Sequence, residues 1–98
     1  MECVELKKII YFQAEQKYVV VHHQGGRLLL EHSLKSLERS YADRFLRIHR
    51  NALVSRQRLT GIDKGADGRC YARLLGCDDH LEISRRHQAE IRAWLRGG

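Results

Sequence analysis

The sequence predicts a mainly β domain, a sandwich of short antiparallel strands with one short internal helix and a helix at the C-terminal end. Short runs of β-branched and aromatic residues alternate with polar or glycine-containing breaks, as in strands that are joined by tight turns. In contrast, only two segments place apolar residues at helical spacing. The 98 residues, 43% of them apolar, suffice for one modest core, so we expect a single domain over residues 1–98.

The first third of the chain is expected to be β. Four strands are predicted, at Val4–Leu6, Ile9–Ala14, Tyr18–His23 and Leu28–Glu31. The polar residues 15–17 form a loop after the second strand, and the pair Gly25-Gly26 turns the chain into the fourth. Three valines in succession, at 19–21, indicate a strand that is covered on both faces, as in stacked sheets.

A short helix is expected next. Ser33 is suited to cap it, and Leu34, Leu37 and Tyr41 are spaced to form one buried stripe. Further strands are predicted at Phe45–His49, near Arg58–Asp63, at Cys70–Leu75 and at Leu81–Ile83. Asn51–Ser55 is expected to be a tight connecting segment.

A turn at 64–68 and a terminal helix complete the predicted elements. Lys64–Gly68 is a turn by composition, and the helix runs from about Arg86 to Arg96. Its inner stripe is His87 or Gln88 with Ile91, Trp94 and Leu95.

The cysteines and the apolar runs limit the class of protein. Cys3, Cys70 and Cys77 are odd in number and lack the spacing of a disulfide framework, so we expect reduced thiols in a cytoplasmic protein. The longest apolar runs, Tyr18–Val21 and Leu28–Leu30, are far shorter than a membrane span, and no secretory signal opens the chain. We therefore expect no membrane partner.

Arginine is concentrated in one acid-free stretch. The net charge is +6, and the residues from 44 to 62 include five arginines and no acid. The five are Arg44, Arg47, Arg50, Arg56 and Arg58. Arg50 and Asn51 are the side-chain types that pair bidentately with guanine and adenine, and Ser55 has a hydroxyl suited to a phosphate. The alternative is that the arginines lie over the sheet and bond carbonyls; five together favour nucleic acid.

A second basic group precedes the terminal helix. If Ser84 caps this helix, Arg85 and Arg86 lie in its first turn, where the helix dipole already places partial positive charge. Each such arginine costs from a few tenths of a kcal/mol up to about 1 kcal/mol. This cost favours an anionic partner such as DNA over the alternative of two side chains that project into water.

The loop at 15–18 offers a third possible contact. Lys17 is placed to reach a base edge or a phosphate, and Tyr18 to stack or to bind a phosphate through its hydroxyl. A plain hairpin turn with Tyr18 in the core explains the same residues equally well.

Metal binding and a helix-turn-helix are disfavoured. Cys70, Cys77 and His80 lack the paired CxxC spacing of a zinc site, and we expect no metal. The terminal helix is basic and amphipathic, but a helix-turn-helix needs another helix three or four residues before it, and Leu81–Ile83 is expected to be a strand.

Catalysis is also disfavoured. Ser84 and His87, with Asp78 or Asp79, are the residue types of a hydrolase triad, but no nucleophile elbow or glycine-rich oxyanion loop accompanies them. No phosphate-binding or dinucleotide fingerprint is present. We therefore expect no catalytic residue, no cofactor and no enzyme.

Five blocks of residues follow one another in a particular order. They are Ile10-Tyr11-Phe12-Gln13-Ala14, Lys17-Tyr18-Val19, Ser33-Leu34-Lys35-x-Leu37-Glu38, Phe45-x-Arg47-Ile48-His49-Arg50-Asn51-x-Leu53-Val54 and Ile83-Ser84-Arg85-Arg86. This series resembles the LytTR family of DNA-binding domains, and the resemblance covers nearly the whole chain. The block that begins at Phe45 and the closing Ser-Arg-Arg are its most specific parts.

The resemblance implies an elongated β–β–β sandwich of about ten strands in three small sheets. It further implies that loops, not a recognition helix, enter successive major grooves on one face of a bent duplex. Base contacts would fall to Lys17, Arg50 and Arg85. Support, mostly at phosphates, would come from Tyr18, Arg47, Asn51 and Arg86.

The resemblance also implies partners. Family members usually bind paired direct repeats, one domain per repeat, and are usually joined to an N-terminal receiver domain. No receiver is present in this sequence, so we expect either an excised effector half or a stand-alone form. Ser55 departs from the family, which often has asparagine there. The expected function is therefore that of a sequence-specific, double-stranded DNA-binding effector domain of a bacterial two-component response regulator, dimeric on DNA and cytoplasmic.

Two other classes remain open at this stage. An RNA-binding β module would need exposed aromatic side chains on a sheet face, for which Tyr18 and Tyr71 are the candidates. A protein-interaction domain would use Trp94 and the basic helix as its docking face. Steep salt dependence of duplex binding separates the DNA hypothesis from both.

Overall fold

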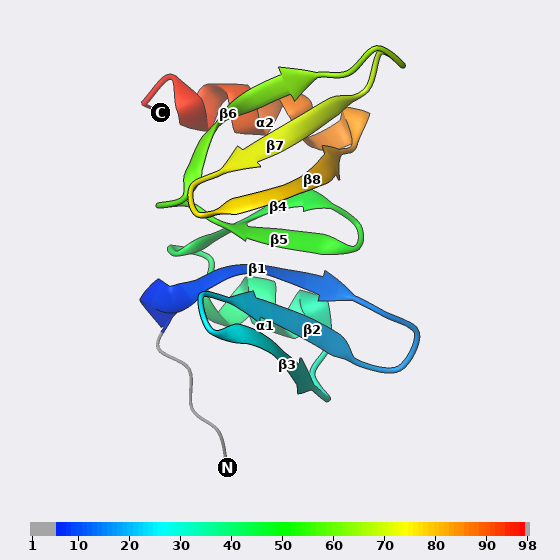
Figure 1. Cartoon of the computed structure of the whole chain (residues 1–98), viewed down its shortest axis with the longest axis vertical. Helices are drawn as coiled ribbons and strands as arrows, with labels where there is room; N and C mark the ends of the chain where they lie inside the picture. Colours follow the sequence, from blue (N-terminus) through cyan, green and yellow to red (C-terminus); the bar gives the residue numbers. More distant parts are fainter. Residues whose placement is uncertain (1–5, 98) are drawn as a thin grey trace.

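The computed structural model describes residues 6–97, and it confirms a mainly β fold with one internal and one C-terminal α-helix (Figure 1). In chain order the elements are η1 (Leu6–Lys8), β1 (Ile9–Ala14), β2 (Val19–His23), β3 (Gly26–Leu30), α1 (Leu34–Ser40), β4 (Phe45–His49), β5 (Ala52–Ser55), β6 (Leu59–Lys64), β7 (Cys70–Leu74), β8 (Cys77–Ile83) and α2 (Arg85–Leu95). Of the strand predicted at Val4–Leu6, Val4 and Glu5 lie outside the described residues, as does Cys3, and Leu6 begins the 3₁₀-helix η1.

The eight strands of residues 6–97 pair antiparallel in two sheets, whereas the resemblance implied about ten strands in three. The larger sheet has the order β3-β2-β1-β5-β4, and the smaller one β6-β7-β8. The β2–β3 hairpin turns where Gly26 takes a φ of 140°, a conformation that a residue with a Cβ rarely adopts. The antiparallel sandwich class is thus confirmed, with fewer sheets.

Two predicted segments differ from the structure. Asn51–Ser55 is not only a connection, because Ala52–Ser55 forms β5, a strand inside the larger sheet with all four residues buried. Both of its faces are covered, so it lacks the alternation that marks a half-buried strand. The strand predicted at Leu81–Ile83 begins earlier, at Cys77, with exposed polar residues that give no apolar signal.

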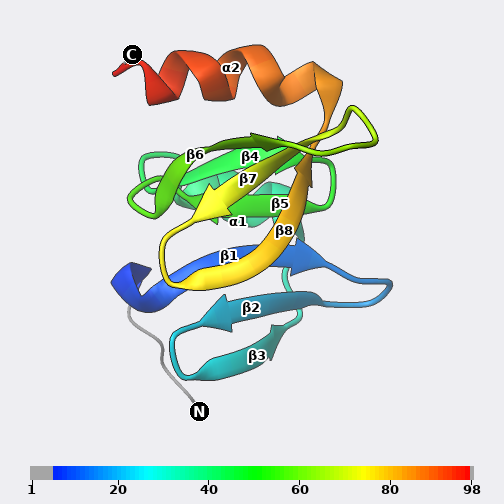
Figure 2. The ribbon, with the colours of Figure 1, turned by 45° about the horizontal axis from the view of Figure 1, so that its top comes forward.

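Two hydrophobic cores lie on opposite faces of the larger sheet. One lies between this sheet, the smaller sheet and α2, and its buried residues are Ile10, Tyr11, Leu46, Ile48, Ala52, Val54, Leu59, Cys70, Ala72, Leu74, Leu81, Ile83 and Ile91. The other lies between the larger sheet and α1, and consists of Ile9, Phe12, Val19, Val21, Leu34, Leu37, Phe45 and Leu53. The molecule is elongated, with extents of 40 × 27 × 25 Å, and Figure 2 shows α2 along its upper side.

Both helices dock as their spacing predicts. The Ser33 hydroxyl caps α1 by accepting a 3.1 Å hydrogen bond from the amide of Ser36, and Leu34 and Leu37 are buried. The helix α2 packs against β4 and β6. On its inner face Ile91 is fully buried, and Trp94 and Leu95 are partly buried. No helix among residues 6–97 is long and apolar enough to cross a membrane.

A polar bridge joins the two sheets. The hydroxyl of Tyr11 on β1 donates to Asp79 on β8 over 2.8 Å, and the Tyr11 ring stacks on His22 at 4.1 Å between centroids. Burial and the nearby Asp79 carboxylate raise the pKa of Tyr11, which therefore stays a protonated donor. This bridge fixes β8 over β1.

Candidate nucleic-acid interface

The β1–β2 loop presents Lys17 and Tyr18 to solvent. The loop is closed by a 2.8 Å hydrogen bond from the amide of Glu15 to the carbonyl of Tyr18, and the strands on either side pair at Ala14 and Val19. Lys17 is exposed and Tyr18 is 41% exposed. The alternative that placed Tyr18 in the core is therefore wrong, although the segment is the hairpin turn that this alternative assumed.

The β4–β5 turn consists of Arg50 and Asn51, both exposed. No residue in the described part of the chain except glycine has a positive φ, so this turn does not use the left-handed geometry of the commonest two-residue hairpins. Instead, the register shifts between Arg47 and His49 and leaves Ile48 without a partner in β5. The bulge reshapes the hairpin and orients the turn.

Arg47 is half-buried behind this turn and is already engaged. Its Nε donates to the carbonyl of His49 over 2.7 Å, and its Nη2 donates to the carbonyl of Arg50 over 2.6 Å. Its Nη1 forms a 2.7 Å ion pair with Glu38 of α1. The imidazole of His49 adds a further contact, because its Nδ1 accepts from the amide of Asn51 at 3.2 Å.

The β8–α2 junction presents Arg85 and Arg86 in the first turn of α2, as predicted, and both are exposed. Ser84 occupies the N-cap position, but its side chain makes no capping hydrogen bond. Its hydroxyl lies 2.6 Å from Nδ1 of His87 instead. The first turn of α2 therefore has neither an acidic residue nor a side-chain cap to offset its partial positive charge.

His87 is suited to accept the Ser84 hydroxyl. Burial lowers the pKa of His87, and the nearby guanidinium of Arg86 lowers it further. In the neutral tautomer whose Nδ1 carries no proton, Nδ1 accepts from the Ser84 hydroxyl, and the Ser84 oxygen accepts no hydrogen bond from a helix amide.

Two backbone hydrogen bonds join the three segments. The amide of Ala14, at the start of the β1–β2 loop, donates to the carbonyl of Asn51 over 2.8 Å. The amide of Ser84 donates to the carbonyl of Ile48 over 2.9 Å. The three segments consequently lie side by side at one end of the strands, along the side of the molecule that is at the right in Figures 1 and 2.

A small hollow lies beside the β4–β5 turn, between residues of β1 and β8. Its volume is about 180 Å³, and it is lined by Gln13, His49, Asn51, Ala52, Leu81 and Glu82. The exposed basic side chains Lys17, Arg50, Arg85 and Arg86 surround this end, which therefore combines positive charge with hydrogen-bonding groups on a rigid frame.

The other arginines of the acid-free stretch lie at the opposite end. Arg56 and Arg58 follow β5, which runs away from the Arg50–Asn51 turn, and Arg44 precedes β4. Arg56 donates to the carbonyl of Ala42 over 3.0 Å and lies 5.0 Å from the ring centroid of Trp94. For this residue, carbonyl bonding is the correct explanation.

Arg58 and Ser55 also have local structural surroundings. Arg58 donates to the carbonyl of Leu75 over 3.0 Å and to that of Lys7 over 3.2 Å. Ser55 is buried at the end of β5, far from the turn, so its hydroxyl is not placed to bind a phosphate beside Arg50.

The residues weighed for catalysis do not assemble into a triad. Ser84 and His87 are in contact, but Asp79 accepts from Tyr11 of the larger sheet and does not orient His87. Over residues 6–97, no group of three or more His, Cys, Asp or Glu side chains is arranged to hold a metal ion.

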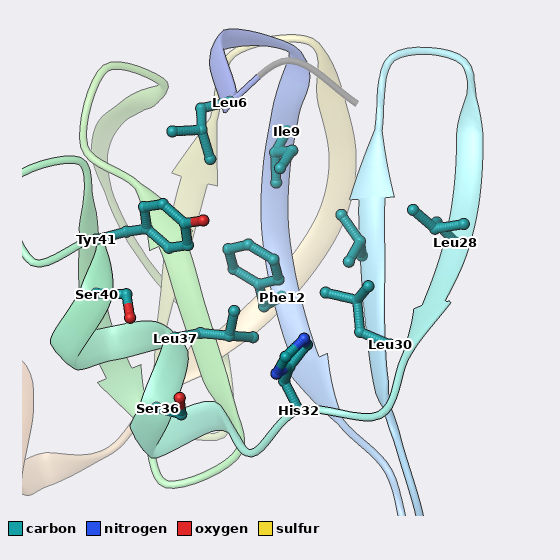
Figure 3. Close-up of a pocket in the computed structure, with 11 residues that line it drawn as sticks. Leu6, Ile9, Phe12, Leu28, Leu30, His32, Ser36, Leu37, Ser40 and Tyr41 are labelled. Atoms are coloured by element: carbon teal, nitrogen blue, oxygen red, sulfur yellow. The ribbon is translucent and has the colours of Figure 1, made fainter. Parts of the chain in front are cut away.

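A cavity of about 300 Å³ lies away from this end, between α1 and the sheet face formed by β1, β2 and β3 (Figure 3). Phe12 lies at its floor, with Leu37 and Tyr41 on one side and Leu28 and Leu30 on the other. Neither lysine nor arginine is among the described residues that line it.

Comparison with known proteins gives this arrangement a family. The family description of the LytTr DNA-binding domain matches residues 1–96. The chain belongs to the LytTR family. The LytTR family is one of DNA-binding domains and not of enzymes, in agreement with the expectation from the sequence.

Two curated relatives share the LytTR domain. The chain is 43% identical over 93 residues to the positive alginate biosynthesis regulatory protein of Pseudomonas aeruginosa, covering 94% of this chain and 38% of the relative. It is 30% identical over 95 residues to the CO-responsive transcriptional regulator RcoM of Rhodospirillum rubrum, covering 96% of this chain and 40% of the relative. The chain thus spans about two fifths of the length of these relatives.

A solved structure shows the same fold. The LytTr DNA-binding domain of a methyl-accepting/DNA response regulator from Bacillus cereus superposes with a TM-score of 0.79 at 21% identity, covering 94% of this chain and 84% of that one. At this identity the match speaks for the LytTR fold alone.

Sequence reasoning missed the residues that shape the β4–β5 turn. Glu38 forms an ion pair with Arg47, and the imidazole of His49 accepts from the amide of Asn51. The carbonyl of the bulged Ile48 accepts from the amide of Ser84. Glu38 and His49 belong to the blocks that resemble the LytTR family. No local sequence pattern, however, indicates that Glu38 pairs with Arg47 or that His49 binds the amide of Asn51.

Proposed function

We propose that this LytTR domain is the sequence-specific, double-stranded DNA-binding effector part of a bacterial two-component response regulator. The observation that carries the proposal is the convergence of Lys17, Arg50 and Arg85 from three distant segments, which two backbone hydrogen bonds tie together at one end. Phosphate contacts provide affinity for any duplex, whereas side chains at base edges provide sequence preference.

The roles divide by side-chain chemistry. Arg50 and Arg85 have the planar guanidinium that pairs with O6 and N7 of guanine, and Lys17 is a flexible cation for a base edge in the neighbouring groove. The positions beside them, Tyr18, Asn51 and Arg86, bind phosphates and fix the domain on the duplex. The three segments then act as short probes that enter successive major grooves.

The proposal includes partners. The two curated relatives are regulators in which the matching region makes up 38% and 40% of the length, and the solved relative is described as part of a response regulator. An N-terminal receiver domain, paired direct repeats in promoters, two domains on one DNA site and a cytoplasmic location fit this arrangement.

Neither alternative has comparable support. Tyr71 is half-buried, and its hydroxyl donates to Asp67 over 2.9 Å, so it makes a poor stacking platform for RNA. Trp94, the anchor of the protein-interaction hypothesis, is partly buried and lies against Arg56.

The proposal is tested by equilibrium titration of the chain with duplex DNA. A 30-base-pair duplex is first selected from a randomised pool by the chain itself, and a shuffled duplex of equal composition serves as the comparison. We expect tighter binding to the selected duplex. The four exposed cations of this surface, Lys17, Arg50, Arg85 and Arg86, should together displace about four condensed counterions, so affinity should fall about a hundredfold between 50 and 200 mM salt. Weak salt dependence, or tighter binding to single-stranded RNA, would contradict the proposal.

A further inference from the structure

We infer that Arg47 is a positioning residue, which holds the Arg50–Asn51 turn in the shape that meets a base edge, and does not itself bind phosphate. The inference rests on the proposed function and assigns Arg47 a different role from the phosphate contact that the resemblance implied. It follows from where the three nitrogens of the guanidinium point.

The guanidinium of Arg47 binds the two consecutive peptide units that flank Arg50. Its Nε donates to the carbonyl of His49, the last residue of β4, and its Nη2 to the carbonyl of Arg50, the first residue of the turn. A planar, rigid fork is required to reach both carbonyls at 2.7 and 2.6 Å at the same time. The orientation of the peptide that links His49 to Arg50 is thereby fixed by the Arg47 side chain.

The third nitrogen ties this arrangement to α1, a helix that is packed on the larger sheet. Nη1 of Arg47 pairs with Glu38 over 2.7 Å, and the Arg47 side chain is only 18% exposed. Glu38 lies on α1, which is anchored in the second core by Leu34 and Leu37. The core on one face of the larger sheet thus supports the turn through one carboxylate and one guanidinium.

The sheet holds this turn on the β1 side, where the amide of Ala14 donates to the carbonyl of Asn51, but on the β4 side the strand ladder gives it little support. Ile48 has no register partner in β5, and the amide of Asn51 is bound by the His49 side chain rather than by a strand. A two-residue turn beside a bulge has few backbone hydrogen bonds of its own. Holding it in advance lowers the ordering cost of binding and sharpens discrimination between bases.

The same contacts make Arg47 a poor phosphate ligand. A phosphate bound bidentately needs two parallel N–H groups from one edge of the guanidinium. In Arg47, Nε, Nη1 and Nη2 each already have a partner, and Glu38 neutralises the charge. The exposed guanidiniums of Arg50, Arg85 and Arg86 are better placed for that role.

Two substitutions separate positioning from charge. Arg47→Lys keeps the positive charge but loses the fork, and Arg47→Met loses both. Each variant is titrated with the selected and the shuffled 30-base-pair duplexes over a range of salt concentrations. We expect both variants to lose about tenfold or more in affinity for the selected duplex, with affinity for the shuffled duplex within about twofold of the wild type and an unchanged salt slope.

A phosphate contact predicts a different result. Arg47→Lys would then bind both duplexes like the wild type, and Arg47→Met would lose affinity for both and reduce the salt slope by about 1. That outcome would overturn the inference, as would full sequence preference in both variants. Glu38→Gln is the matched control: it keeps an acceptor oxygen for Nη1 and should retain the sequence preference.

A measurement without DNA keeps the inference testable if the proposed function fails. Backbone ¹⁵N relaxation of the free chain reports the order parameters of Arg50 and Asn51. We expect values near those of a rigid backbone, about 0.85, in the wild type, and a drop below about 0.6 in Arg47→Met with the strands unchanged. A turn that stays equally ordered in a folded Arg47→Met variant would refute the positioning role.

Discussion

The amide of Ser84 donates a 2.9 Å hydrogen bond to the carbonyl of Ile48, and this contact joins the start of α2 to the bulged strand β4. Ile48 has no register partner in β5, and its carbonyl meets the end of β8. The first turn of α2 and the β4–β5 turn are consequently held next to each other. Arg85 and Arg50, which are 35 positions apart in the sequence, therefore belong to one surface.

Replacing Arg50 with alanine should lower the affinity for DNA and reduce the sequence preference. We expect a loss of about 1–3 kcal/mol on the selected duplex and a smaller loss on a shuffled one, because a bidentate base contact is removed along with a charge. Titrations of both duplexes give the two values.

Arg44 provides the matched control for Arg50. It is an exposed arginine of the same acid-free stretch, but it precedes β4 and therefore lies at the opposite end of that strand from Arg50. Arg44→Ala removes the same charge and should leave binding to both duplexes almost unchanged. Equal losses for the two variants would show that overall charge, not position, determines affinity.

Arg85→Ala should change stability and binding in opposite directions. Arg85 opens α2, where a cation opposes the helix dipole, so its removal should raise the free energy of unfolding by a few tenths of a kcal/mol. Binding to the selected duplex should weaken by about 1–3 kcal/mol at the same time. Urea unfolding and DNA titration of one preparation measure both; a variant that is destabilised would contradict the dipole argument.

The strands with strong local patterns were predictable, and β5 was not. Ile9–Ala14 and Phe45–His49 match the structure because β-branched and aromatic residues fill them. Ala52–Ser55 has four residues buried on two faces, which is too short and too uniform to show a period. Its pairing with β1 is a long-range contact between separate sequence segments, and local patterns carry no information on such pairing.

For the candidate site, the residue types were predictable but their surroundings were not. The charge pattern identified arginines suited to nucleic acid but did not separate Arg56 or Arg58 from Arg50; only the resemblance singled out Arg50. Arg56 and Arg58 differ from Arg50 because their guanidinium groups donate to backbone carbonyls. Every residue has a carbonyl, so the sequence does not indicate which carbonyls are reached. The fold alone determines which arginine finds one and which remains exposed.

Acidification should destabilise the domain through His87. Burial lowers the pKa of His87 from its usual 6.5, with Arg86 acting in the same direction, so the folded chain binds fewer protons than the unfolded chain below that pH. Stability then rises with pH in this range, is fully present above about pH 6.5 and is lost as the pH falls below it. The pKa of His22 is lowered by burial as well and adds to the effect.

Urea unfolding between about pH 5 and 7.5 measures this dependence. His87→Gln removes one of the two histidines whose pKa is lowered, so the stability of the variant should vary less with pH over this range than that of the wild type. A parallel pH profile in the variant would show that His87 has the same pKa in the folded and unfolded chains.

Ile91 should be essential for holding α2 in place. It is fully buried between α2 and the sheets, so Ile91→Ala leaves a cavity and should lower the free energy of unfolding by about 2–5 kcal/mol. Urea unfolding tests this value. Ala93→Ser, on the exposed side of the same helix, should cost well under 1 kcal/mol, and a similar loss in both variants would contradict the packing of α2.

The central claim is that DNA is bound at the end formed by the β1–β2 loop, the β4–β5 turn and the start of α2. The most direct test is an NMR titration of the ¹⁵N-labelled chain with the selected duplex, following every backbone amide. The account predicts that the largest shifts fall at residues 15–18, 50–51 and 84–87, with little change at 56–58, 75 and 94. Shifts concentrated at that opposite end, or around the cavity beside α1, would contradict it.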